Sequence, residues 1–283
     1  KRPYPGYPRF VLYRLGRIFP AYVLWTVIHL LVWSRGGRHL TPAMVLRAIW
    51  EGTGYYHLYF IPLIVHFYLL YPLLRPFLRQ TKGLVISLII TLVAQVIANY
   101  LYRPSWLHIR DPRNILTGLF YFALGVWCAD RVALLKSDRR TLWNVLVTMA
   151  GVGLVAEAYA GLAHGKSIGE AVDQMRPPVI LYSIIFGAWV WSRQWTDKWL
   201  SKVLSFFAEH SFFIYLSHVL LLNEFVAAWR RAGAGVTTPI FFVSAFTVVT
   251  GLSVIVALSM KHVGDAVGLL VASKREKPLT RVE

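Results

Sequence analysis

The chain has one cysteine among its 283 residues, and acidic residues are scarce. Because Cys128 has no second cysteine to pair with, it can form no internal disulfide and no cysteine metal cluster, and it lies inside an apolar run. Only 13 Asp and Glu stand against 30 Lys and Arg, which gives a net charge of +17. In a soluble protein this balance would suggest a nucleic-acid partner. Here the charges fall between long apolar runs, so we predict no nucleic-acid partner and expect contacts with anionic membrane lipids.

Several motifs of soluble enzymes are also missing. The sequence has no glycine-rich phosphate loop, no HExxH motif and no paired Cys/His spacing, so it predicts no bound metal. A GxSxG nucleophile elbow is absent as well, so nothing supports a serine-type catalytic triad.

Long apolar runs are what the sequence does contain. Hydrophobic residues make up 57% of the chain and aromatic residues 15%. A spanning helix needs about 20 mostly apolar residues, and about eight runs approach that length. We predict an all-α, polytopic helical membrane bundle with spans near 18–34, 58–75, 83–102, 114–132, 143–163, 177–193, 204–225 and 238–260. The stretch 40–52 has the pattern of a short amphipathic surface helix.

Lysine and arginine predict the orientation of these spans. If the chain starts in the cytoplasm, about two thirds of the 30 Lys and Arg residues fall on the cytoplasmic side, as the positive-inside rule requires. Both ends of the chain are then cytoplasmic. We divide the chain into a transmembrane domain, 1–263, and a basic cytoplasmic tail, 264–283.

The first candidate site is a pair of arginines where the first span begins. Arg14 and Arg17 are one helical turn apart and therefore share a helix face. Their planar donor forks suit phosphate groups. The alternative is ordinary: both arginines could anchor the span to lipid phosphates.

Two further candidates contain histidine. His57 lies among tyrosines at the outer end of its span and could transfer protons, or could simply belong to the interfacial aromatic belt. Ser211, Tyr215 and His218 recur on one helix face, as expected for residues that line a cavity or that hydrogen-bond to neighbouring helices. Four isolated polar residues fall inside apolar runs, namely His29, His66, Asn99 and Glu157.

Taken in order, these segments resemble the membrane-bound acyltransferase-3 family, which includes bacterial sugar O-acetylases. The similarity covers nearly the whole chain and rests on YRLGRIFPAY at 13–22, HLYFIPL at 57–63 followed by YLLYP at 68–72, SFFIYLSH at 211–218 and, more weakly, FALG at 122–125.

The resemblance implies transfer of an acyl group, commonly acetyl, from cytoplasmic acyl-CoA to a hydroxyl of a cell-envelope or exported carbohydrate. It implies a multi-pass protein of the bacterial inner membrane. Arg14 and Arg17 would hold the CoA phosphates, and Ser211 and Tyr215 would line the cavity. Within this chain His57 and His218 are the catalytic candidates, although neither corresponds to the family's first-span histidine. The acyl group, the acceptor sugar and the oligomeric state stay open.

The chain also departs from the family pattern. The family has about ten spans, with a catalytic histidine on the first, whereas this chain begins near the third. We therefore expect a truncated or inactive form, because that histidine has no counterpart here. Polar residues at depth also fit a transporter of polysaccharide or lipid-linked glycan. A third hypothesis is a catalytically inactive partner that binds a synthase.

Overall fold

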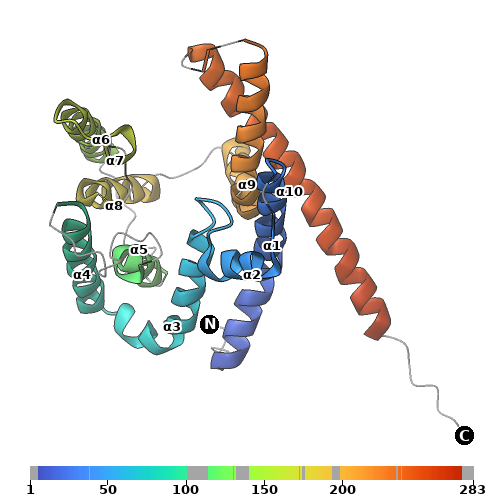
Figure 1. The fold of residues 1–283 in the computed structure, drawn as a ribbon. Coiled ribbons are helices and arrows are strands. Elements are labelled where there is room, and N and C mark those ends of the chain that lie inside the picture. Colours follow the sequence, from blue (N-terminus) through green and yellow to red (C-terminus); the bar gives the residue numbers. More distant parts are fainter. Residues whose placement is uncertain are drawn as a thin grey trace, which may run out of the picture. The chain divides into compact units, whose positions relative to one another are not determined.

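The structure is a computed structural model that describes residues 6–37, 39–100, 114–129, 131, 140–171, 173, 176–192, 198–233, 235–236 and 238–275. For residues 99, 100, 140, 168 and 262–275 only the backbone is described. Within these residues every regular element is a helix (Figure 1). The helices are α1 (Tyr7–Ser34), α2 (Pro42–Glu51), α3 (Phe60–Leu78), α4 (Thr81–Tyr100), α5 (Ile115–Cys128), α6 (Arg140–Ala163), α7 (Ile168–Ala171), α8 (Pro177–Ser192), α9 (Lys198–Arg231) and α10 (Pro239–Arg275).

An apolar helix stands at each of the predicted spans, which confirms the polytopic helical bundle. In the described part of the chain, six helices are long and apolar enough to cross a membrane, namely α1, α3, α4, α6, α9 and α10. The apolar helices α5 and α8 are shorter. The predicted surface helix is α2, and its Trp50 is exposed. Helix α10 continues to Arg275, so the predicted tail begins as helix.

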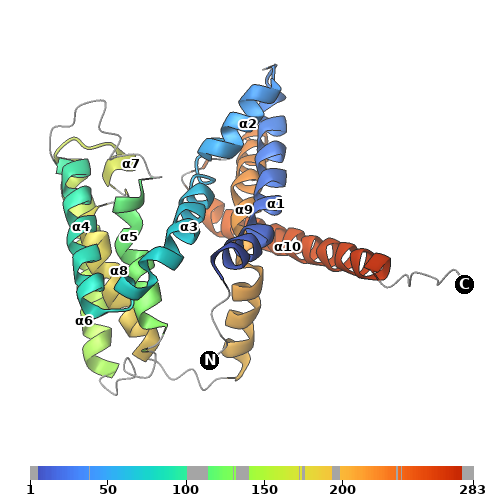
Figure 2. The same cartoon turned by 90° about the horizontal axis from the view of Figure 1, so that it is seen from below.

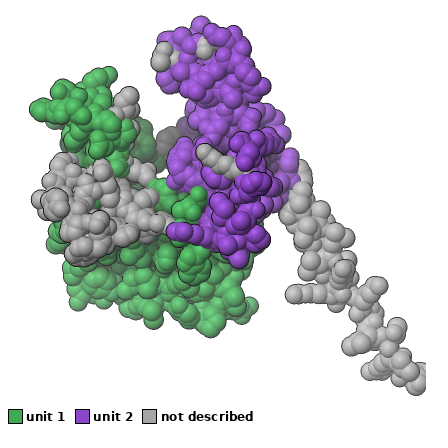
Figure 3. Space-filling view, in the orientation of Figure 1, with its two compact units in different colours: residues 1–20, 50–53, 59–195 green, residues 21–49, 54–58, 196–283 purple. Residues whose placement is uncertain are grey.

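The chain divides into two compact units, shown in different colours in Figure 3. Unit 1 comprises residues 1–20, 50–53 and 59–195, and unit 2 comprises residues 21–49, 54–58 and 196–283. In unit 1, α4 packs against α5 and α6 packs against α8 (Figure 2). The buried Thr91 hydroxyl joins α4 to α5, because it donates to the Leu116 carbonyl (2.8 Å) and accepts from the Phe120 amide (3.0 Å).

The isolated polar residues of unit 1 have different environments. Glu157 of α6 forms an ion pair with Arg176, which is only 4% exposed. A charge inside apolar surroundings needs such a partner. His66 of α3 is exposed, and the side chain of Asn99 lies outside the described residues.

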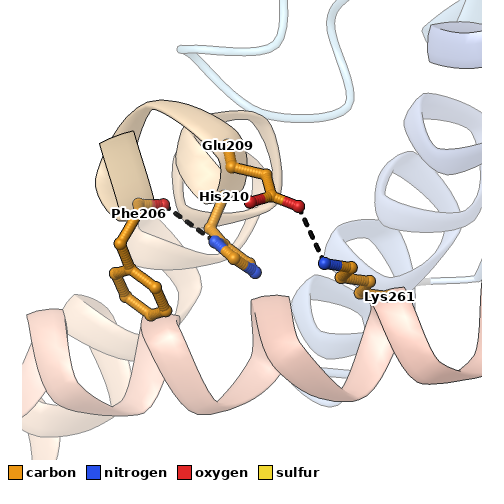
Figure 4. A network of polar contacts seen from close by, with 4 residues as sticks. All are labelled: Phe206, Glu209, His210 and Lys261. Carbon is orange, nitrogen blue, oxygen red and sulfur yellow. Dashed lines mark hydrogen bonds and ion pairs between the residues drawn. The ribbon is translucent and has the colours of Figure 1, made fainter. Parts of the chain in front are cut away.

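Unit 2 contains α9, α10 and the parts of α1 and α2 that belong to it. The Tyr22 hydroxyl donates to the Ile49 carbonyl (2.6 Å), which fastens α1 to α2. Helices α9 and α10 pack together, and the Lys261 ammonium contacts the Glu209 carboxylate at 2.7 Å (Figure 4). Beside this pair, the His210 ring donates to the carbonyl of Phe206 (2.8 Å). The ion pair thus joins α9 to α10, and the hydrogen bond lies within α9.

Candidate functional site

The arginine pair lies on the part of α1 that belongs to unit 1, and both side chains are exposed. The Arg14 guanidinium lies over the rings of Phe10 and Tyr68, at 5.6 Å from each centroid. The Arg17 guanidinium lies over Tyr13 at 5.9 Å. Aromatic faces hold a guanidinium through the cation–π interaction and leave its N–H groups outward. Among the described residues neither arginine pairs with a carboxylate, so both forks can receive an anion.

Contacts between α1 and α3 fix this aromatic support. Phe10 is buried against Tyr71, with centroids 5.2 Å apart, and meets Tyr68 edge to face at 6.3 Å. The Tyr7 hydroxyl donates to the Leu69 carbonyl (3.1 Å). The two motifs that the sequence analysis treated separately, around 13–22 and 68–72, therefore meet in one place. These contacts hold the Arg14 side chain in a defined position on the protein surface.

His57 lies in a tight turn between α2 and α3. Gly52 has a φ of +70°, which favours glycine, and closes α2. Gly54 approaches Thr26 of α1 so closely that a Cβ there would lie 2.6 Å from the Thr26 methyl carbon. The Leu58 amide then bonds to the Tyr55 carbonyl (3.0 Å). These constraints bury His57, which is only 6% exposed.

In unit 2 three imidazoles meet, one from each of three segments. The His57 ring lies 5.3 Å from His29 of α1 and 5.4 Å from His218 of α9, both edge to face. The Tyr55 ring stacks on His29 at 5.0 Å, and Tyr215 meets His57 at 5.3 Å. We call His29, Tyr55, His57, Tyr215 and His218 the histidine cluster. The described residues provide no set of three His, Cys, Asp or Glu side chains placed to hold a metal.

Hydrogen bonds to carbonyl groups settle which ring nitrogens carry protons in the neutral rings, because a carbonyl only accepts. His29 Nε2 donates to the Leu216 carbonyl (3.3 Å). His218 Nδ1 donates to the carbonyls of Tyr215 (2.8 Å) and Ile214 (3.2 Å). The lone pairs then stand on His29 Nδ1 and on His218 Nε2. His218 is half-buried, so its Nε2 is the more accessible of the two.

Several ring nitrogens in the cluster are buried without a partner. Among the described residues no hydrogen bond reaches His29 Nδ1, His57 Nδ1 or His57 Nε2. Buried polar atoms are nearly always satisfied, so a group of such atoms requires an explanation. A hydroxyl-bearing ligand would supply the missing donors and acceptors.

The electrostatics of His57 favour its neutral form. Burial, with smaller effects from His29 and His218, lowers the pKa of His57 to about 4. His57 is therefore uncharged at neutral pH and can both donate and accept a hydrogen bond. Burial also raises the pKa of the adjacent Tyr56 phenol, which keeps its proton.

The structure brings some predicted residues together and leaves one aside. Tyr215 donates its hydroxyl to the His57 carbonyl, so the predicted residues His57, Tyr215 and His218 do meet. Ser211 is exposed, and its hydroxyl donates to the Ala208 carbonyl of its own helix (2.9 Å). Sequence reasoning left His29 as an isolated polar residue, because its place beside His57 arises only through tertiary contacts.

The fold and these two groups of residues define a multi-pass membrane protein with an exposed arginine pair and a largely buried histidine cluster. The sequence model of the acyltransferase domain family, acyltransferase 3, matches residues 1–258. The chain belongs to this family and carries a membrane acyltransferase domain. Comparisons with curated proteins and with solved structures gave no match.

Proposed function

We propose that the protein transfers an acyl group, such as acetyl, from cytoplasmic acyl-CoA to a hydroxyl of a cell-envelope or exported carbohydrate. The observation that carries this proposal is the set of buried imidazole nitrogens without partners at His29 and His57. A sugar hydroxyl both donates and accepts, so it complements such a set. Membership of the acyltransferase family supports the reaction class.

The donor would bind through the arginine pair. CoA carries phosphates, and the guanidinium groups of Arg14 and Arg17 are exposed, braced from one side by aromatic rings. Charge-assisted bonds of this kind contribute about 1.5–3 kcal/mol each. The predicted cytoplasmic position of the pair suits a cytoplasmic donor.

The histidine cluster would serve the acceptor. His57, neutral and buried, would orient the hydroxyl, and His218 Nε2 would accept its proton as the oxygen attacks the thioester carbonyl. The new C–O bond forms, the C–S bond breaks and the CoA thiolate leaves, to be protonated by the imidazolium. General acid–base catalysis of this kind supplies about 10²–10⁴-fold in rate, and holding both substrates supplies more.

The test uses membranes that contain the full chain and acetyl-CoA labelled in the acetyl group. We expect label in a base-labile ester on carbohydrate, reduced at least about 100-fold by His218→Gln. The matched control is His164→Gln, which alters an exposed histidine in the turn directly after α6 and should keep full transfer.

Two other outcomes would overturn the proposal. Glycan that crosses vesicle membranes without acyl-CoA, and without ester formation, would identify a transporter instead. Co-purification with a synthase, without acyl-CoA binding, would identify an inactive partner.

A further inference from the structure

Unit 1 contains a cavity that the proposed reaction does not use. Its volume is about 490 Å³, within the ~300–1,000 Å³ typical of small-molecule sites. Helices α3, α4, α5 and α8 provide the lining. All four are apolar, and the walls are largely aliphatic and aromatic, including Leu63, Phe67 and Phe122. The rings of Phe67 and Phe122 stack on each other, with centroids 4.4 Å apart.

The polar groups of this cavity are gathered at one place. The side chains of Gln95, Tyr121 and Ser183 all line this cavity, and Gln95 and Ser183 act on the Tyr121 phenol as polar neighbours. Gln95 also donates to the Thr117 carbonyl (3.3 Å), which holds its amide in position. Three helices thus contribute one amide, one phenol and one hydroxyl to a single polar corner.

This polar corner lies at a common end of the helices. Thr117 and Tyr121 fall in the first two turns of α5, Ser183 in the second turn of α8, and Gln95 in the last two turns of α4. The orientation predicted from lysine and arginine makes this the outer end. A ligand that fits has an apolar body and one uncharged hydrogen-bonding head near that end.

We infer that this cavity binds a single-chain amphiphile drawn from the membrane, with an alkyl chain against Phe67 and Phe122 and a hydroxyl or carbonyl head at Gln95, Tyr121 and Ser183. The apolar walls exclude a bare carbohydrate, since its hydroxyls would lose their bonds to water. Among the described residues that line the cavity none is charged, so a phosphate head is disfavoured too.

Gly118 provides a direct test, because it lines the cavity beside Leu63 and Phe67. An added Cβ would lie 3.6 Å from Leu63 and 3.7 Å from Phe67, so a larger side chain can extend into the space. Gly125 is the matched control: it lies on the same helix, is exposed and would meet nothing within 4 Å.

The experiment uses the purified full chain and a C16 alcohol that carries a photoreactive diazirine and an alkyne handle. We expect saturable labelling that maps to α3 and α5, reduced at least about tenfold by Gly118→Leu and unchanged by Gly125→Leu. Ser183→Ala should weaken labelling by the alcohol but not by a matched hydrocarbon without the hydroxyl.

Competition separates the sources of the ligand. Unlabelled C16 alcohol should displace the probe, because its single chain and uncharged head match the cavity, whereas phospholipid vesicles should not. Displacement by phospholipid as effective as displacement by the alcohol would contradict the assignment of an uncharged, single-chain ligand. Labelling that does not saturate, or that persists equally in Gly118→Leu, would overturn the inference. Because the readout is binding, this result does not depend on acyl transfer.

Discussion

At the scale of the residue, His57 occupies a position that opposes protonation. It is 6% exposed and lies against two further imidazoles, His29 and His218. Protonation of the His57 ring is unfavourable because burial removes the hydration of the charged form. The neighbouring imidazoles of His29 and His218 would add a like charge if either were protonated. The backbone carbonyl of the same residue is held by the Tyr215 hydroxyl, so the ring has little freedom to turn outward.

This position predicts how stability depends on pH. Between about pH 4 and 6.5 the unfolded chain binds a proton at His57 and the folded chain does not, so stability falls as the pH falls through this window. The slope approaches about 1.4 kcal/mol per pH unit. His57→Gln removes this contribution, and its melting temperature relative to wild type should rise from pH 7 to pH 5.

Thermal unfolding of the purified protein in detergent at pH 7, 6 and 5 measures this effect. His29, His218, Tyr55, Tyr56 and Tyr215 face the ring in both proteins, so their contributions largely cancel in the difference. His164→Gln, which alters an exposed histidine, should leave the difference flat. A constant difference between His57→Gln and wild type at all three pH values would refute the shifted pKa.

At the scale of the element, the turn before α3 depends on two glycines for different reasons. Gly52 needs its positive φ, and Gly54 needs the absence of a side chain against Thr26. The turn places His57 beside α1 and α9, so its shape decides whether the histidine cluster forms. Thr26 is completely buried, which leaves it little room to move away.

We expect Gly54→Ala to destabilise the protein by about 1–3 kcal/mol, as overpacking of a dense site does. Thr26→Ser removes the methyl group that the new Cβ would strike. The double variant should therefore be more stable than the sum of the two single changes predicts. Chemical denaturation of the wild type, the two single variants and the double variant gives the four free energies of unfolding. If the two single changes in this free energy add strictly, contact with Thr26 is not what makes an alanine at position 54 unfavourable.

Most elements, but few contacts between them, followed from the sequence. Apolar length located eight apolar helices, six of them long enough to cross a membrane in the described part of the chain, and the pattern around Ala48 and Trp50 located α2. The motifs identified His57, Tyr215 and His218. His29 could not be recognised, because a lone polar residue in an apolar helix gives no sign of its neighbour. Gln95 was missed for the same reason, since Tyr121 and Ser183, which line the same cavity, come from other helices.

At the scale of the whole molecule, the orientation in the membrane links the proposed roles. The excess of lysine and arginine on one side predicts that Arg9 and Gln80 face the cytoplasm, and that Arg35, His164 and Ala232 face outward. The arginine pair can reach a cytoplasmic donor only in this orientation.

Cysteine labelling tests the orientation, and the chain suits the method because Cys128 is its only cysteine. In a Cys128→Ser background, single cysteines at 35, 164 and 232 should react with an impermeant maleimide in intact cells. Cysteines at 9 and 80 should react only after the membrane is opened. The reverse pattern would place the arginines on the wrong side for acyl-CoA.

The most direct test of the account is the binding of acetyl-CoA to the purified full chain. We predict that the double variant Arg14→Gln/Arg17→Gln raises the Kd by about 100-fold, since two charge-assisted contacts are lost. Arg9→Gln, an exposed arginine of the same helix, should change the Kd by less than about threefold. An unchanged Kd in the double variant would contradict the assignment of this arginine pair to the acyl donor.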